Sequence, residues 1–329
     1  MNLKITIMQH NNQVVDVSDW RRDEEHATYP EGARDKTLLY CPSLPPYNFL
    51  KKDRRYLFKR SSPRYPEQFW VEIIGYLIGI QMDIPVPPAF VAYDSKKNQS
   101  GALIEWFLNS IPLLGDENHI IGGDYCQQYI SNFDRKKGEQ HNFETVARIF
   151  EDLNKKYTNL NIDWKNFWAK TLTFDALIGN TDRHQDNWGI IVTPSHADDS
   201  SSEKMRISPV FDNGTSMGHE ILSSKFKYYE DNNHLEKYIS KGWHHMKWGI
   251  NDTSSTGHIE MLIKYTDKYP ETRQFILECL NKINYDIFKS ILDTCTTFEV
   301  PVRLTAERAT FMLRLLQFRH QRLLHELEK

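Results

Sequence analysis

The chain has 329 residues, of which 40% are hydrophobic and 26% are charged, and its formal net charge is −3. This composition is ordinary for a folded globular protein, and the length allows one large domain or two lobes. The small net charge gives no indication of nucleic acid or of a membrane surface as a partner. We therefore expect neither direct nucleic-acid contact nor membrane association.

The cysteines and the N-terminal segment bear on the cellular compartment. Four cysteines lie far apart in the sequence, with no spacing typical of a metal site: Cys41, Cys126, Cys279 and Cys295. Free thiols in a reducing compartment are the simplest interpretation. The N-terminal residues lack the long apolar stretch of a secretory signal, and no apolar window approaches membrane-spanning length. These features favour the cytoplasm, although delivery into another cell is an alternative.

The first 108 residues are rich in strand patterns and contain one clear helix pattern. Apolar alternation and short apolar runs predict strands at residues 2–8, 37–40, 56–59, 90–93 and 102–108. Residues 28–36 are expected to form a turn or loop, and the proline-containing residues 41–53 an irregular segment. Apolar residues at positions 69, 70, 73, 74, 77 and 78 predict a helix over 67–81, and Pro66 suits its first turn.

Helix patterns predominate after about residue 124. Two short strands are expected to flank a polar hairpin tip at 195–204. Thr305 is a candidate N-cap for a long terminal helix. The predicted helices are 143–155, 161–178, 257–268, 270–281, 284–295 and 306–328. The sequence thus predicts an α+β, bilobal fold with a β-rich nucleotide-binding lobe at 1–108 and a helical lobe at 109–329.

Two polar segments provide the groups that phosphoryl transfer requires. Asp182 and Asn187 lie in the loop Asn-Thr-Asp-Arg-His-Gln-Asp-Asn, and Asp212 follows the apolar run Ile207 to Phe211. In kinases one aspartate accepts the hydroxyl proton of the substrate, while an asparagine and a second aspartate hold Mg²⁺. We assign these roles to Asp182, Asn187 and Asp212. The competing interpretation is a loop whose side chains make only local turn bonds.

His184 has two equally weighted interpretations. It is either a catalytic-loop residue that orients Asp182 or contacts phosphate, or a buried structural histidine bonded to backbone. We do not assign it as the general base, because Asp182 is nearby in the sequence.

A lysine and a glutamate form the second candidate group. Lys59 ends a predicted strand and is expected to contact the α- and β-phosphates of a nucleotide. Glu72, on the following helix, is the preferred acidic partner because apolar residues surround it. Glu67 is the alternative, but a negative charge in the first turn is explained by the helix dipole alone.

The remaining nucleotide candidates have weaker signals. Gly32 and Lys36 belong to a predicted turn between strands, which is either a phosphate-covering loop or an ordinary hairpin. The backbone groups of Glu105 and Phe107 follow the strand-rich part and are candidates for contact with adenine.

These residues together resemble the HipA-like serine/threonine kinases of bacterial toxin–antitoxin systems. The similar blocks appear in the family's order and are residues 32–37, 56–59, 105–107, 180–187 and 209–212. The block at 180–187 is the most specific of them. The resemblance implies a protein-kinase-like fold, use of ATP and Mg²⁺, and phosphorylation of a protein serine or threonine. It also implies that Gly32, Ala33 and Lys36 belong to the nucleotide loop.

The chain also departs from the family. It is shorter than the full-length members and resembles the compact form that lacks an extra N-terminal subdomain. Residues 28–30 carry no serine where the family has its regulatory autophosphorylated serine. Thr28, Ser61 and Ser62 are the substitutes we consider. Whether an antitoxin partner exists is left open by the sequence, as is the identity of the protein substrate.

Two other functions compete with a protein kinase that acts as a toxin or as a secreted effector. The string Asp-Arg-His followed by Asn also resembles lipid-kinase loops, which makes a phosphoinositide or small-molecule kinase an alternative. A nucleotide-binding pseudokinase is the second alternative. The presence of Lys59, Asp182, Asn187 and Asp212 argues against a pseudokinase.

Overall fold

The computed structural model describes residues 9–24, 35–111, 115–157, 162–193 and 204–329. The chain divides into two compact units, each built from separate stretches. The first comprises Met1–Trp106, Asn213–Leu235 and Lys282–Phe318, and the second comprises Phe107–Asp212, Glu236–Asn281 and Arg319–Lys329. The two units are described separately below, and the predicted division at residue 108 stays a prediction.

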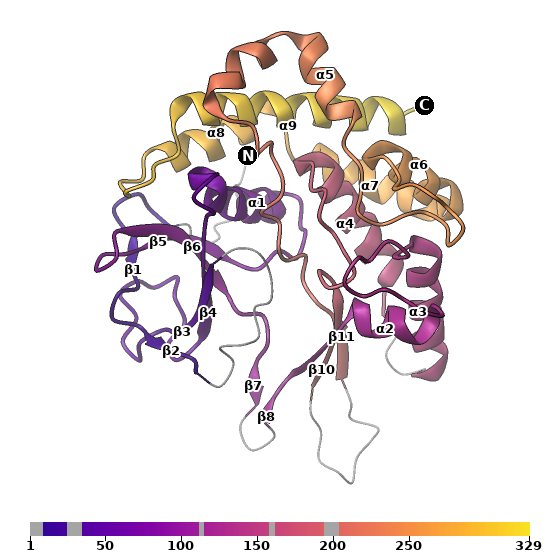
Figure 1. Cartoon of the computed structure of the whole chain (residues 1–329), viewed down its shortest axis with the longest axis horizontal. Coiled ribbons are helices and arrows are strands. Elements are labelled where there is room, and N and C mark those ends of the chain that lie inside the picture. Colours follow the sequence, from indigo (N-terminus) through magenta and orange to yellow (C-terminus); the bar gives the residue numbers. More distant parts are fainter. Residues whose placement is uncertain (1–8, 25–34, 112–114, 158–161, 194–203) are drawn as a thin grey trace. The chain divides into compact units, whose positions relative to one another are not determined.

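A six-stranded sheet forms the frame of the first unit (Figure 1). Its strand order is β1-β5-β6-β4-β3-β2, and only the described β1–β5 pair is parallel. The strands are β1 (Val15–Asp16), β2 (Arg21–Arg22), β3 (Lys36–Tyr40), β4 (Arg55–Arg60), β5 (Ala89–Asp94) and β6 (Gln99–Glu105). The central strands β4 and β6 pair Phe58 with Leu103 and Lys59 with Ala102. Because side chains alternate along a strand, Phe58 and Lys59 face opposite sides of the sheet.

The strands of this sheet contribute aromatic and aliphatic side chains to a buried core. Trp20, Tyr56, Phe58, Phe90 and Leu103 belong to one buried cluster. The helix α1 (Phe69–Gln81), preceded by a 3₁₀ turn at Pro66–Gln68, contacts β5, β6 and α8 (Tyr285–Thr296). Most of its residues are buried, which explains why apolar side chains appear on nearly every side of it.

The second unit combines helices with a small sheet. Its three-stranded sheet has the order β11-β10-β9, and a short hairpin pairs β7 with β8. The strands are β7 (Ser110–Ile111), β8 (Gly115–Asp116), β9 (Asn118–Ile121), β10 (Gly189–Thr193) and β11 (Lys204–Ile207). The helices are α2 (Gly122–Tyr129), α3 (Phe143–Lys156), α4 (Trp164–Ile178), α6 (His258–Lys268) and α7 (Arg273–Asn281). The helix α4 contacts both α6 and α7 and so lies at the centre of this helical layer.

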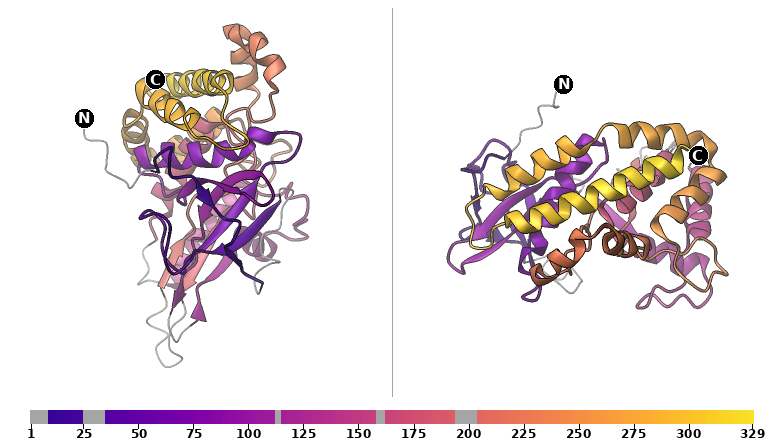
Figure 2. Two further views of the ribbon diagram at one scale, coloured as in Figure 1. Left: turned by 90° about the vertical axis from the view of Figure 1, so that its left-hand side faces the viewer. Right: turned by 90° about the horizontal axis from the view of Figure 1, so that it is seen from above.

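Two helices cross the division between the units. The helix α5 (Asn232–Ser240) begins in the first unit and ends in the second. The long C-terminal helix α9 (Ala306–Leu327), drawn in yellow in Figure 2, belongs to the first unit as far as Phe318 and to the second from Arg319. Thr305 caps it, because its hydroxyl accepts the Arg308 N–H at 3.2 Å.

The structure confirms most of the elements expected from the sequence. The predicted strands at 37–40, 56–59, 90–93 and 102–108 correspond to β3, β4, β5 and β6, although β6 ends at Glu105. All six helices that were predicted after residue 124 are present within a few residues, and α4 begins at Trp164 rather than at 161. The predicted strand at 2–8, most of the loop at 28–36 and the hairpin tip lie outside the described residues.

Two further expectations can be checked. The four cysteines are buried free thiols. None of the helices in the described ranges is long and apolar enough to cross a membrane.

Candidate active site

In the first unit, strand β4 and helix α1 bring Lys59 and Glu72 together. The Lys59 ammonium donates to Glu72 Oε1 at 2.7 Å, and the two residues are only 3% and 4% exposed. A buried ion pair needs close geometry to offset the desolvation of both charges. The alternative partner, Glu67, accepts hydrogen bonds from Thr305 and Arg308 instead. The preference for Glu72 as the partner of Lys59 therefore agrees with the structure, while the nucleotide role of the pair stays a prediction.

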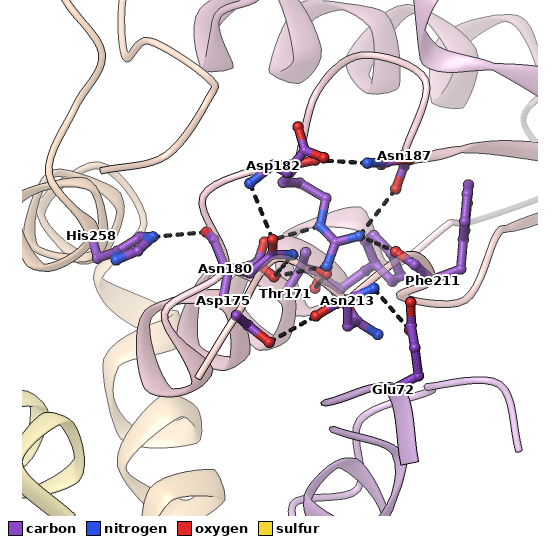
Figure 3. A network of polar contacts seen from close by, with 12 residues as sticks. Glu72, Thr171, Asp175, Asn180, Asp182, Asn187, Phe211, Asn213 and His258 are labelled. Atoms are coloured by element: carbon purple, nitrogen blue, oxygen red, sulfur yellow. Dashed lines mark hydrogen bonds and ion pairs between the residues drawn. The ribbon is translucent and has the colours of Figure 1, made fainter. Parts of the chain in front are cut away.

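Glu72 also holds the segment that follows the predicted metal-binding aspartate. Its second oxygen, Oε2, accepts the backbone N–H of Asn213 at 3.1 Å (Figure 3). Asn213 is the residue after Asp212 in the chain. One carboxylate thus satisfies both a buried ammonium and a buried backbone donor. Buried polar groups of this kind are normally paired.

Other predicted nucleotide residues of the first unit have varied environments. Lys36 lies in β3 and pairs in register with Lys59 of β4. The Glu105 side chain accepts a hydrogen bond from Lys51 at 2.7 Å and forms an ion pair with Arg54 at 3.3 Å. The Glu105 backbone N–H donates to the Pro88 carbonyl. Gly32 and Ala33 lie outside the described residues.

In the second unit, α4 ends at a left-handed glycine that directs the chain into the loop bearing Asp182. Gly179 has φ +70°, and a Cβ there would lie 2.7 Å from the guanidinium of Arg319. Glycine fits both requirements, as is common at helix C-termini. Asn180 then donates its side-chain N–H to Asp175 Oδ1 and accepts the Asp182 N–H on its own Oδ1, each at 3.1 Å.

Arg183 ties this loop to α4 and to the segment before Asp212. Its Nε and Nη2 donate to the two oxygens of Asp175 at 3.0 and 2.7 Å, and neither side chain is more than 1% exposed. Its Nη1 donates to the carbonyls of Asn187, at 3.3 Å, and of Phe211. The fork geometry of arginine suits such a bidentate carboxylate contact. Arg183 therefore joins three backbone segments through one buried side chain.

The Asn187 side chain is oriented by the backbone of Asp182, the candidate general base. Its Nδ2 donates to the Asp182 carbonyl at 2.6 Å (Figure 3), so its Oδ1 is the group it can offer to a cation. Asp212 has φ +55°, a region where aspartate and asparagine are enriched over other non-glycine residues. An amide oxygen and a carboxylate are the hard ligands that Mg²⁺ prefers. The donor set of Asn187 and Asp212 therefore fits Mg²⁺.

Burial and neighbouring charges shift the pKa of the Asp182 carboxyl. Burial raises the pKa of its carboxyl above the usual value, and the negative charge of Asp212 raises it further. The nearby His184, His245 and Arg183 act in the opposite direction. The His184 ring lies 5.9 Å from the ring of His245 and accepts the Asp186 N–H on Nδ1. Through this hydrogen bond, His184 stabilises the loop at 180–187.

Phe107 contacts the residue that precedes Asp212. Its ring packs against Phe211 with centroids 5.0 Å apart, and both rings contact His119. The Phe107 carbonyl, one of the backbone groups considered for adenine, accepts a hydrogen bond from Arg206 at 2.9 Å. Arg206 also forms a 2.7 Å ion pair with Glu117.

Several residues that organise the site were not singled out from the sequence. They are Gln68, Asp175, Arg183, Arg206 and His245. In the sequence, Asp175 is a charged residue among apolar neighbours, and in the structure it is buried. A charged residue in such a position needs a partner, so the sequence does indicate that one exists. Nothing in the sequence shows that the partner is Arg183, eight residues later.

Comparisons with known proteins agree with the motifs. The model of the HipA-like C-terminal domain family matches residues 28–273. The crystal structure of the Helicobacter pylori proinflammatory kinase CtkA matches with a TM-score of 0.68 and 17% identity, covering 95% of this chain and 96% of that one. This likeness confirms the predicted kinase-like α+β fold.

A second solved structure is similar to a smaller extent. HipA of Shewanella oneidensis MR-1, solved with HipB and its operator DNA, gives a TM-score of 0.45 and 15% identity. The match covers 91% of this chain and 64% of that one. A search of curated proteins finds no match.

Proposed function

Because the chain belongs to the HipA-like C-terminal domain family, we propose that it is an ATP- and Mg²⁺-dependent serine/threonine protein kinase. The observation that carries the proposal is the loop at 180–187, where the Asn187 amide donates to the Asp182 carbonyl at 2.6 Å. This bond sets a metal ligand and a candidate base in one fixed loop. Such preorganisation is the main contribution that a protein makes to phosphoryl transfer.

Each residue has a defined role in this proposal. Asp182 accepts the proton of the substrate hydroxyl, and burial, which raises the pKa of its carboxyl, makes the carboxylate a better proton acceptor. Asn187 and Asp212 hold Mg²⁺, which would neutralise charge on the phosphate oxygens of ATP. Lys59, held by Glu72, binds those oxygens.

The remaining predicted residues complete the nucleotide site. In this proposal Lys36 contacts the phosphates from the start of β3 rather than from the predicted loop, while Gly32 and Ala33, outside the described residues, keep the phosphate role that the sequence predicts. Backbone groups of Glu105 and Phe107 contact adenine. His184 keeps the loop around Asp182 in place through its bond from Asp186.

Family membership also supports a toxin role with an antitoxin partner, and action as a secreted effector is the alternative. Of the autophosphorylation candidates, Thr28 lies outside the described residues. The Ser61 hydroxyl accepts the Phe69 N–H at 2.8 Å, at the start of α1. Phosphorylation of Ser61 would therefore place a charged group at the N-terminus of α1, the helix that carries Glu72.

The test is a transfer assay with Mg²⁺ and γ-labelled ATP on three acceptors: the protein itself, a bacterial protein extract, and vesicles containing phosphoinositides. We expect label on protein serine or threonine and none when Asp182→Ala replaces the wild type. Label on lipid and on no protein would reject the proposal in favour of a lipid kinase. Nucleotide binding without transfer to any acceptor would indicate a pseudokinase.

A further inference from the structure

Helix α1 and the turn before it hold the two residues that follow Asp212. The Gln68 Nε2 donates to the Gly214 carbonyl at 2.9 Å, and Glu72 Oε2 accepts the Asn213 N–H at 3.1 Å. Gln68 and Glu72 are four residues apart, so they lie on the same side of the helix. Gln68 is 5% exposed and Asn213 is 1% exposed. Two consecutive residues are thus fixed from one helical face.

A third hydrogen bond joins Ser216 to Asn213 within the segment after Asp212. The Ser216 hydroxyl donates to the Asn213 carbonyl at 2.7 Å. Both polar backbone groups of Asn213 and the carbonyl of Gly214 therefore have side-chain partners in the first unit. Unpaired buried backbone groups are costly, so losing one of these partners would free the segment to rearrange.

Asp212 itself depends on its neighbours for its conformation. Its φ of +55° lies in the left-handed region, which non-glycine residues adopt only when the surrounding structure favours it. The position of the peptide unit that follows Asp212 restricts the ψ angle of Asp212, and so the backbone frame from which its carboxylate projects. A residue that fixes positions 213 and 214 therefore acts on Asp212 through the backbone.

We propose that Gln68 is a positioning residue for metal binding by Asp212. Its amide N–H fixes the Gly214 carbonyl, and the chain then presents the Asp212 carboxylate in the orientation that Mg²⁺ requires. This inference rests on the proposed function, since it assumes that Asp212 is a metal ligand. Gln68 touches neither nucleotide nor metal in this account.

Trp70, two residues after Gln68 in the first turn of α1, provides a matched control. Its indole N–H donates to the Val302 carbonyl at 3.1 Å, and it is fully buried. The bond is of the same kind as that of Gln68, a side-chain N–H to a backbone carbonyl. It leads to the segment before α9 instead of the segment after Asp212, so its loss should affect stability alone.

The experiment compares wild type, Gln68→Met and Trp70→Phe by thermal unfolding with a non-hydrolysable ATP analogue and increasing Mg²⁺. Gln68→Met keeps the length of the side chain but removes the N–H donor. We expect the Mg²⁺ concentration for half-maximal stabilisation to rise about 2- to 10-fold, as the loss of one hydrogen bond predicts. Trp70→Phe should lower the melting temperature and leave that Mg²⁺ midpoint unchanged. The Mg²⁺ dependence of phosphoryl transfer should shift in the same way.

Two results would overturn the inference while the proposed function stands. One is a Gln68→Met midpoint equal to that of the wild type, and the other is an equal shift in both variants, which would indicate general destabilisation. If the wild type itself shows no Mg²⁺-dependent stabilisation by the nucleotide, the metal role of Asp212 is wrong, and the inference fails with it.

Discussion

Replacing Arg183 with methionine tests how the loop bearing Asp182 is held. The change removes the two bonds to Asp175, at 2.7 and 3.0 Å, and leaves that carboxylate in a site with no solvent exposure. The carboxylate keeps the 3.1 Å bond from Asn180, which does not balance its charge. Breaking a buried pair by removing one partner typically costs about 3–5 kcal/mol. We expect a loss of that size in the free energy of unfolding.

The assay is urea unfolding, monitored by tryptophan fluorescence, for the four proteins of a double-mutant cycle. Asp175→Leu together with Arg183→Met removes both charges, and the double variant should be more stable than either single variant. A control, Lys289→Met, breaks an exposed pair with Asp293 on α8 and should cause no measurable loss. A loss below about 1 kcal/mol for Arg183→Met, or strictly additive effects in the cycle, would refute the reasoning.

Three further predictions concern other buried groups. Glu72→Gln removes the carboxylate that pairs with the buried Lys59 ammonium. We expect the free energy of unfolding, measured by denaturant titration, to fall by about 3–5 kcal/mol. A loss no larger than that caused by replacing an exposed glutamate with glutamine would contradict this. Burial lowers the pKa of His244 to about 4 from an unfolded value of about 6.5, so the unfolded chain binds more protons between these pH values. Its stability contribution is then complete above pH 6.5 and lost as the pH falls towards 4, by about 3 kcal/mol; His244→Phe should flatten the pH dependence in that window, and an unchanged profile would disprove the assignment. Gly189→Ala would place a Cβ 2.4 Å from the Ile120 carbonyl oxygen. We expect the free energy of unfolding to fall by about 1–3 kcal/mol, measured as a lowered melting temperature. An unchanged melting temperature would show that the strand shifts without cost.

Local patterns explain why much of the framework was predictable from the sequence. Apolar periodicity located α1, and the apolar neighbours of Glu72 pointed to the residue that lies 2.7 Å from Lys59. The order and spacing of Asp182, Asn187 and Asp212 along the chain were enough to indicate a kinase-like loop. These features depend on residues close in sequence, or on a motif whose spacing is itself the signal.

Contacts between distant segments could not be predicted in the same way. Gln68 and Gly214 are 146 residues apart, and their bond exists only because the chain returns to α1 after leaving the first unit. The partner of Asp175 depends on the left-handed turn at Gly179, which sets the direction of the following loop. Such pairings follow from the tertiary arrangement, for which a single sequence gives no spacing rule.

The most direct test of the central claim is the rate of phosphoryl transfer from γ-labelled ATP to protein, for wild type and Asp182→Asn under identical Mg²⁺ conditions. Asp182→Asn keeps the shape of the side chain and removes the proton acceptor. We predict a rate at least about 100-fold below that of the wild type, as expected for the loss of a general base, with ATP binding retained. Equal rates for the two proteins, or no transfer to protein by the wild type, would contradict the account.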